Sequence, residues 1–262
     1  AYATDERRAD WFPLCDVPEE PVILDIGAGW GAVSIALARR GARVIAADSN
    51  IETLEFIALK AEQEGLGDRV VAVRIDPLET VQLPVEDGSI DLVIMNGVLE
   101  WVGPATQGAS PTTLQRRVLT GVHRALAKGG QLYVGIESRF SIENFRGAKD
   151  HSGMSYTALL PRKVASWVTQ RAGKGPYRTY THGHGAWMRI FRETGFGPVK
   201  TYAAMPDYRF PDRTLPLDDA GSFRATIESV GVSRKHRYVL TALSYLGLHK
   251  NAVGHFSMVA DK

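Results

Sequence analysis

The sequence has very little cysteine and no long apolar run. Cys15 is the only cysteine among 262 residues, so the chain can form no internal disulfide and no cysteine-based metal site. No stretch approaches about 18 consecutive apolar residues, which argues against a membrane span, and residues 1–8 contain no apolar signal core. We therefore expect a cytoplasmic protein. Because the chain begins with Ala1 and not with methionine, we also expect it to be processed or cut from a longer one.

A strong excess of charge of either sign is also lacking. Apolar residues make up 44% of the chain and charged residues 23%, and the net charge is only +2, so the composition argues against a disordered protein. Single hydrophobic cores rarely grow much beyond about 250–300 residues. We therefore expect residues 1–262 to form a single domain.

This balance conceals a division of charge along the chain. Residues 1–100 contain 8 Lys and Arg against 19 Asp and Glu, a net charge of −11, whereas residues 101–262 contain 23 against 10, a net charge of +13. Such a division is typical of two halves that meet different ligands, although a solvated surface gives the same count. Motifs that place a ligand in each half would favour the first interpretation over the second.

Apolar runs alternate with helical patterns in the first half of the chain. Strands that alternate with helices in this way predict an α/β fold, in which a parallel sheet is covered by helices on both faces. The predicted strands occupy residues 21–26, 43–47, 69–73, 90–95 and 131–136, and the predicted helices occupy residues 31–40, 51–64 and 112–127.

The alternation stops after Glu137, and two irregular stretches follow. Residues 138–183 and 205–253 are predicted to be insertions, with helical patterns near 162–171 and 235–248. Between and after them, residues 185–194 predict a helix, and residues 199–204 and 255–260 predict two further strands. The insertions lie in the basic half of the chain, so we expect them to form a cap over the second ligand.

A glycine-rich loop follows the first predicted strand. Gly27, Ala28, Gly29 and Gly31 allow a tight turn and a close approach of the backbone to a ligand at the carboxyl edge of the sheet. Asp48 ends the second predicted strand, where a carboxylate can bind ribose hydroxyls. These features suit a nicotinamide dinucleotide as well as another adenosine ligand, and a purely structural glycine turn is the plain alternative.

Residues beyond the loop separate these ligands. Asp25 precedes the loop, and Asp76 follows the third predicted strand, where it can accept a hydrogen bond from an adenine amino group. The runs LPVEDGSIDLV at 83–93, NGVLEWV at 96–102, LAKGGQL at 126–132 and FRETGF at 191–196 resemble the class I S-adenosylmethionine-dependent methyltransferases, and within them the small-molecule group that includes the ubiquinone-pathway enzymes. The resemblance covers residues 20–136, 185–204 and 254–262, and residues 20–136 would form the cofactor-binding core.

The resemblance implies a Rossmann-like sheet of seven mostly parallel strands, with a last antiparallel strand inserted beside strand six. It also implies S-adenosylmethionine as the cofactor and assigns its contacts. Asp25 and residues 27–31 would face the methionine end, Asp48 with Ser49 would hold the ribose, Asp76 with Pro77 would lie at the adenine, and Asn96, Gly97 and Val98 would line the sulfonium region. Trp101 stands where the family often has a histidine, and it offers either an aromatic wall or ordinary core packing.

The acceptor side contains several candidates for a proton acceptor. His151 is the first and His182 the second, because imidazole titrates near neutral pH; a surface or structural histidine is the plain alternative for each. Glu137 and Glu143 are possible bases or acceptor anchors. Because no third ligand accompanies His182 and His184, we expect no metal.

Transfer to an oxygen is the reaction that the motifs favour. The Asp/Asn-Pro-Pro-aromatic motif of many amine and base methyltransferases is absent after the fourth strand, where Asn96 is followed by Gly97. We therefore expect O-methylation of a hydroxylated small molecule that is anionic, in keeping with the basic half. N-methylation, a larger anionic acceptor, a nicotinamide-dependent oxidoreductase and a non-catalytic binding module are the alternatives. No RNA-binding module is evident, which disfavours nucleic acid as the acceptor.

Overall fold

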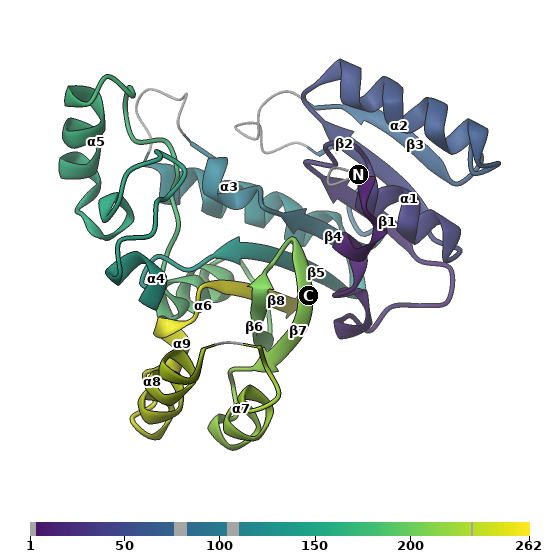
Figure 1. The fold of residues 1–262 in the computed structure, drawn as a ribbon. Coiled ribbons are helices and arrows are strands. Elements are labelled where there is room, and N and C mark those ends of the chain that lie inside the picture. The colour runs from purple at the N-terminus through teal and green to yellow at the C-terminus, as the bar shows by residue number, and fades with distance from the viewer. Residues whose placement is uncertain (1–3, 76–82, 104–109, 232) are drawn as a thin grey trace.

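The computed structural model describes residues 4–75, 83–103, 110–231 and 233–262. Within them, one mixed sheet of eight strands runs through the middle of the molecule (Figure 1). Its order across the sheet is β3 (Val70–Arg74), β2 (Arg43–Asp48), β1 (Val22–Ile26), β4 (Ile90–Asn96), β5 (Leu126–Glu137), β8 (His255–Asp261), β6 (Val199–Asp207) and β7 (Phe210–Pro216).

The prediction of a Rossmann-like α/β sheet is confirmed, and the predicted strand count is wrong by one. The first five strands pair in parallel, and β8 lies antiparallel between β5 and β6. The additional strand is β7, which forms an antiparallel hairpin with β6 and lies within the stretch that we expected to be an insertion. Pro211 and Pro216 lie in β7. Proline has no N–H to donate between paired strands and is confined to edge strands. Its presence in residues 210–216 therefore argued against a strand in the sequence, although β7 lies at the edge of the sheet.

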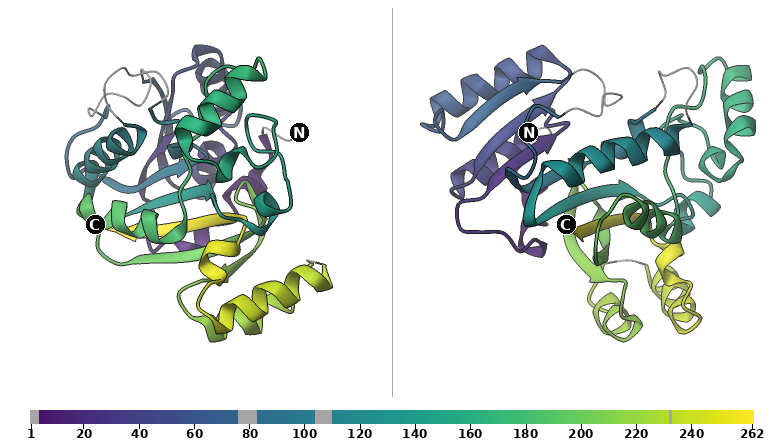
Figure 2. Two further views of the ribbon diagram at one scale, coloured as in Figure 1. Left: turned by 90° about the vertical axis from the view of Figure 1, so that its left-hand side faces the viewer. Right: turned by 180° about the vertical axis from the view of Figure 1, so that it is seen from behind.

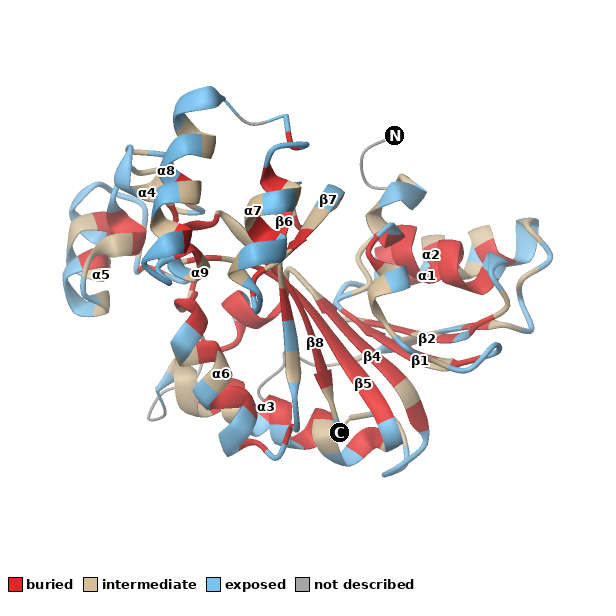
Figure 3. Cartoon of the chain, turned by 90° about the horizontal axis from the view of Figure 1, so that it is seen from below, coloured by how far each residue is buried: buried red, intermediate tan, exposed pale blue. Residues whose placement is uncertain are grey.

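Helices cover both faces of the sheet because the central strands are apolar on both sides. In β1, Ile23 packs beneath α1 (Ala32–Arg39) and α2 (Ile51–Gln63), whereas Leu24 packs beneath α3 (Pro111–Ala125) and α6 (His184–Glu193). Both side chains are fully buried. Figure 3 shows that β4, β5 and β8 are buried along most of their length. The carboxyl ends of β1, β2, β4 and β5 therefore meet at one edge between two helical layers.

The additions to this core lie on the side of the sheet away from α1 and α2 (Figures 1 and 2). Residues 138–183 contain α4 (Ile142–Phe145), the short 3-10 turn η5 (Thr157–Leu159) and α5 (Arg162–Arg171). Residues 205–253 contain β7 and the helices α7 (Ala220–Ile227), α8 (Arg234–Tyr245) and α9 (His249–Ala252). The helix predicted at 162–171 has the predicted bounds, and α7 was not predicted. Among the described residues, no helix is long and apolar enough to cross a membrane.

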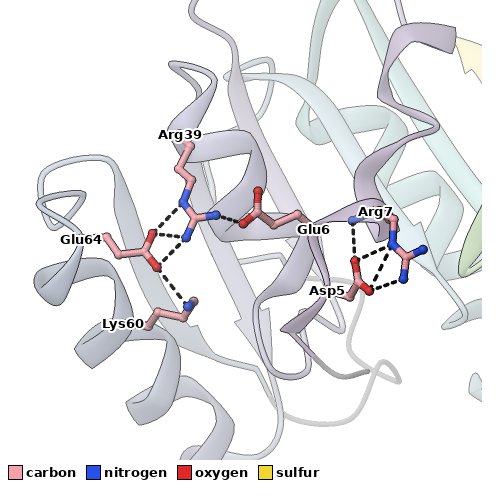
Figure 4. Close-up of polar contacts among 6 residues, drawn as sticks. All are labelled: Asp5, Glu6, Arg7, Arg39, Lys60 and Glu64. Carbon is pink, nitrogen blue, oxygen red and sulfur yellow. Dashed lines mark hydrogen bonds and ion pairs between the residues drawn. The ribbon is translucent and has the colours of Figure 1, made fainter. Parts of the chain in front are cut away.

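The N-terminal segment is fastened to the sheet by stacking and by ion pairs. Trp11 lies flat on Tyr133 of β5, with ring centroids 3.4 Å apart, and both side chains are buried. Arg39 of α1 bridges Glu6, in the 3-10 turn η2 (Glu6–Ala9), and Glu64 at the end of α2 (Figure 4). The segment thereby closes the side of the core formed by α1 and α2.

Candidate active site

The glycine loop leaves β1 and turns into α1 at the carboxyl edge of the sheet. Gly27, Gly29 and Gly31 have φ values of +74°, +53° and +73°, a region that other residues avoid. A Cβ on Gly27 would come within 2.5 Å of Val98, and one on Gly31 within 2.6 Å of Ile57. Gly27 and Gly31 are therefore required by packing, whereas a Cβ on Gly29 would meet nothing within 4 Å among the described residues. No described residue therefore crowds Gly29 on the side where a side chain would stand.

Asp48 lies against this loop. Its Oδ2 accepts a hydrogen bond from the Gly29 amide at 2.9 Å, and its Oδ1 accepts one from the Asn50 amide at 3.0 Å. The carboxylate is only partly buried, and Ser49 beside it is exposed. Each carboxylate oxygen has a second lone pair, so Asp48 can accept further hydrogen bonds from a ligand while it holds the loop.

Asp25 is the buried acid of the loop, with 3% of its surface exposed. Burial raises its pKa to about 6, although its Oδ2 accepts a 2.6 Å hydrogen bond from Ser34. Removal from water disfavours the charged form of a carboxyl group. A cation bound near this group would reverse the effect, because an opposite charge favours the carboxylate. Asp76 and Pro77, predicted at the adenine, lie outside the described residues.

The end of β4 presents a second set of predicted residues. The Asn96 side chain lies over Gly135 of β5, where a Cβ would overlap its amide. Both amide atoms are buried, and within the described part of the chain neither has a hydrogen-bond partner. Gly97 has a φ of +78°, and a Cβ on it would come within 2.9 Å of the Tyr208 hydroxyl. Val98 packs on Gly27, so the β4 turn and the glycine loop are in direct contact.

A pair of titratable side chains lies beyond the end of β5. His151 Nε2 is 3.1 Å from Oε1 of Glu137, the last residue of the strand, and Arg209 Nη2 is 3.7 Å from the same oxygen. The hydrogen bond to Glu137 raises the pKa of His151, against an opposing effect of burial. Trp101 is 45% exposed and presents its ring to the edge of the His151 ring at 5.0 Å. His151, Glu137 and Trp101 therefore form one cluster next to the end of β4.

Asp150 holds the loop that carries His151. Its Oδ1 accepts hydrogen bonds from the amide and hydroxyl of Ser152, and its Oδ2 accepts them from the hydroxyls of Thr157 and Tyr177. Asp150 thus fixes the position of His151 without touching its ring, and Glu137 orients the ring.

Sequence reasoning overlooked two members of this neighbourhood. Glu100 has no exposed surface, and burial raises its pKa to about 7. Its Oε1 accepts a long, 3.4 Å hydrogen bond from Tyr208, and among the described residues its Oε2 has no partner. Tyr208 comes from the end of β6, 108 residues away along the chain. Glu100 stands in the NGVLEWV run, which marks the place, but only tertiary packing shows that it is buried.

The second histidine candidate makes its contacts elsewhere. His182 Nε2 lies 2.8 Å from the side-chain oxygen of Gln115 on α3, and its ring packs edge-on against Trp187 of α6. Burial lowers the pKa of His182 to about 4. It is therefore neutral and joins α3 to α6, while His151 alone of the two lies in the cluster with Glu137. In the described ranges no three His, Cys, Asp or Glu side chains are grouped so as to hold a metal ion.

Comparison with known proteins identifies the family of the chain. A family model described as a methyltransferase domain matches residues 24–134, from β1 into β5. The crystal structure of geranyl diphosphate C-methyltransferase from Streptomyces coelicolor superposes with a TM-score of 0.57, over 97% of this chain and 79% of that one, at 14% identity. The chain belongs to the class I S-adenosylmethionine-dependent methyltransferases. The cofactor of this family is S-adenosylmethionine, so the nicotinamide alternative is set aside.

Relatives within the family differ in what they methylate. The tRNA 5-carboxymethoxyuridine methyltransferase of Escherichia coli K12 is 30% identical over 186 residues, which are 68% of this chain and 63% of that protein. The release factor glutamine methyltransferase of Mycobacterium leprae is 39% identical over 88 residues, 33% of this chain and 29% of that one. The chain thus spans less than two thirds of the length of these curated relatives.

The residues present fit this cofactor. Gly29 leaves an open approach to the backbone, Asp48 retains free lone pairs beside it, and the Asn96 amide is buried without a partner in the described part of the chain. All three lie at the carboxyl ends of β1, β2 and β4, where open α/β sheets bind their ligands. When bound there, S-adenosylmethionine would supply a methyl group on a positively charged sulfur.

Proposed function

We propose that the protein methylates a hydroxyl oxygen of a small anionic molecule, with His151 as the general base. The contact between His151 and Glu137, at 3.1 Å and next to the end of β4, carries this proposal. Asp48 with Ser49 would hold the ribose, and Asp25 with residues 27–31 would face the methionine end. Asn96, Gly97 and Val98 would line the sulfonium region, and Trp101 would form an aromatic wall beside it.

His151 is suited to take the proton that an acceptor hydroxyl loses. With Glu137 accepting from Nε2–H, the neutral ring leaves Nδ1 as the proton acceptor. The negative charge of Glu137 then stabilises the ring once it is protonated. General-base catalysis of this kind contributes about 10²–10⁴-fold. His182 has no place in this scheme, because it is held by Gln115 between two helices.

The charge of the acceptor follows from the surroundings of this cluster. The insertions at 138–183 and 205–253 flank the cluster, since they supply His151 on one side and Tyr208 with Arg209 on the other. They belong to the half of the chain that carries a net charge of +13. The two insertions themselves contain 15 Lys and Arg against 7 Asp and Glu, a net charge of +8. A cap of this charge favours an anionic acceptor, because complementary fields raise the local concentration of a ligand.

Cofactor binding is tested with S-adenosylhomocysteine, the demethylated cofactor, by isothermal titration calorimetry. Wild type should bind it, and Asp48→Ala should weaken binding about tenfold or more, since a lost hydrogen bond to a charged group costs about 1.5–3 kcal/mol. Asp68→Ala, an exposed residue at the end of another loop, serves as the control and should bind normally. Absence of binding to wild type would refute the proposed function.

The role of His151 is tested with hydroxylated acceptors found in an activity screen. His151→Ala should reduce kcat about 10²–10⁴-fold while it leaves the affinity for S-adenosylhomocysteine unchanged. His123→Ala is the matched control, since His123 lies near the end of α3 and packs edge-on against Phe196, outside the cluster of His151 and Glu137. Unchanged turnover in His151→Ala would remove the base from the proposal.

A larger anionic acceptor is the second candidate. The Escherichia coli relative that aligns over 68% of this chain acts, by its name, on a carboxymethoxyuridine of tRNA. We would therefore also incubate the protein with labelled S-adenosylmethionine and total tRNA. Label that becomes soluble on ribonuclease treatment would favour the RNA-borne acceptor over the free small molecule.

A further inference from the structure

A small pocket opens next to His151. Its volume is about 120 Å³, and it lies between Trp101, the loop of His151, α5 and the extended segment that follows α5. The side chains that matter for its chemistry are Trp101, His151, Thr169, Lys174, Arg178 and Thr179. Pockets that enclose a whole drug-sized ligand measure about 300–1,000 Å³. The His151 pocket is therefore large enough for one functional group of a larger molecule.

Positive charge dominates the lining. Lys174 Nζ donates one hydrogen bond, to the Ser152 carbonyl at 3.0 Å, which leaves two of its N–H groups for another partner. The Arg178 guanidinium has neither a hydrogen bond nor an ion pair with any residue that the structure describes. The ring of His151 adds a third cationic group when it is protonated.

The acidic groups nearby are already engaged. Asp150 accepts four hydrogen bonds from its own loop and from Tyr177. Glu137 is bound to His151, with Arg209 3.7 Å away. Burial raises the pKa of Glu100 to about 7, so this carboxyl is largely uncharged below neutral pH. Among the described residues no carboxylate forms an ion pair with Lys174 or Arg178, so both cations can bind a ligand.

The walls of the pocket are held in place. Arg162 donates to the carbonyls of Thr179 and Thr181 at 2.9 and 2.6 Å and lies over the ring of Tyr180, which fixes the extended segment. The Tyr180 amide donates to the Glu100 carbonyl at 2.8 Å, which joins this segment to the turn that carries Trp101. Thr169 and Thr179 are buried, with 1% and 3% of their surface exposed. The backbone of the segment that carries Arg178 is therefore fixed before a ligand binds, which lowers the entropy that binding costs.

We propose that the His151 pocket binds a compact oxyanion, such as a phosphate or carboxylate group, on the acceptor of the methyl group. Lys174 and Arg178 bind the oxyanion, the apolar part of the acceptor lies on the exposed ring of Trp101, and the reacting hydroxyl meets His151. The inference rests on the proposed function for the identity of the ligand as acceptor. The pocket and its charges stand independently of that function.

The test uses phenyl phosphate as a probe, because it combines a ring with an oxyanion, and phenol as the uncharged comparison. Calorimetry on wild type should show phenyl phosphate binding about tenfold or more tightly than phenol. Arg178→Gln and Lys174→Gln should each weaken phenyl phosphate about tenfold, as expected for a lost charge-assisted hydrogen bond. Arg171→Gln and Lys163→Gln, on exposed positions of α5, are matched controls and should bind as wild type does.

Two results would overturn the proposal. One is equal binding of phenyl phosphate and phenol by wild type, and the other is normal phenyl phosphate affinity in both Arg178→Gln and Lys174→Gln. Binding of S-adenosylhomocysteine is measured with the same preparations, which also shows that each variant is folded. Binding of S-adenosylhomocysteine without binding of phenyl phosphate would refute the oxyanion site and leave the proposed function untouched. A protein that binds phenyl phosphate but not S-adenosylhomocysteine refutes the proposed function and leaves the oxyanion site intact.

Discussion

Among the described residues, Glu137 is the acidic group that binds His151, and this contact has the largest effect on the pH at which the ring can accept a proton. The hydrogen bond to Glu137 raises the pKa of His151 above its ordinary value of 6.5. The pair therefore stabilises the fold at pH values below 6.5, and this stabilisation is lost as the pH rises through the raised pKa. A general base acts in its neutral form, so kcat is expected to rise over the same interval.

Glu137→Gln should separate the two consequences of this contact. Loss of the negative charge lowers the pKa of His151, so the acidic limb of the kcat profile should move to lower pH. The plateau should also fall, because the protonated ring loses its counter-charge. The measurement is kcat against pH for both proteins, with Glu86→Gln, an exposed residue, as the control. An acidic limb that stays in place in Glu137→Gln would mean that another group is the base.

The sequence singled out His151 and Glu137 as separate candidates, and the structure shows that the two side chains form a pair. Asp150, the neighbour of His151 in the chain, accepts hydrogen bonds from its own loop, whereas Glu137 binds the ring. The place of Asp48 beside the glycine loop could be predicted because β1 and β2 are parallel neighbours whose carboxyl ends meet at one edge of the sheet, whereas the roles of these residues toward a cofactor stay predictions. The meeting of Glu100 and Tyr208 could not be predicted, since it depends on contact between the segments that follow β4 and β6, which no local pattern encodes.

At the scale of the elements, the turn after β4 depends on Gly97, which packs against Tyr208. Gly97 has a φ of +78°, and a Cβ there would approach the Tyr208 hydroxyl to 2.9 Å. Gly129 near the start of β5 has a φ of +79°, but among the described residues nothing lies within 4 Å of a Cβ built on it. The two glycines share a backbone conformation and differ in their surroundings.

Alanine at each position should therefore separate backbone strain from crowding. Gly129→Ala should reduce the free energy of unfolding by about 1–2 kcal/mol, the cost of a left-handed residue with a Cβ. Gly97→Ala should cost about 1–3 kcal/mol more, because Tyr208 has to move. Urea denaturation of both variants measures the difference. Equal losses would show that Tyr208 adapts freely and does not constrain this turn.

The order of strands and helices in the core could be read from the sequence because each element repeats its own period over several residues. Strand β7 was not predicted because two prolines and one aspartate interrupt its alternation, and an edge strand tolerates proline whereas a central strand does not. Loss of alternation marked the stretches that we predict to be insertions. Their tertiary contacts could not be predicted in this way, because contacts such as the hydrogen bond from Tyr180 to Glu100 join segments 80 residues apart.

At the scale of the whole molecule, the two charged parts of the sequence are also two sides of the structure. The acidic residues 1–100 build β1 to β4 with α1 and α2, and the basic remainder contributes the side that contains α5 and α8 (Figure 1). The first side contains the glycine loop with Asp25 and Asp48, and the second contains Lys174 and Arg178. A cationic cofactor and an anionic acceptor would thus approach surfaces of opposite charge.

Added salt should therefore raise the KM for the acceptor and leave kcat nearly unchanged. The Debye length falls to about 10 Å at 0.1 M salt and about 3 Å at 1 M, so attraction between the acceptor and the basic side is screened before binding. Once the acceptor is bound at saturation, this attraction no longer limits the rate. Initial-rate kinetics over a salt series measure both constants. Lys174→Gln combined with Arg178→Gln should flatten the dependence, and a KM that ignores salt in wild type would assign the basic residues to solvated surface.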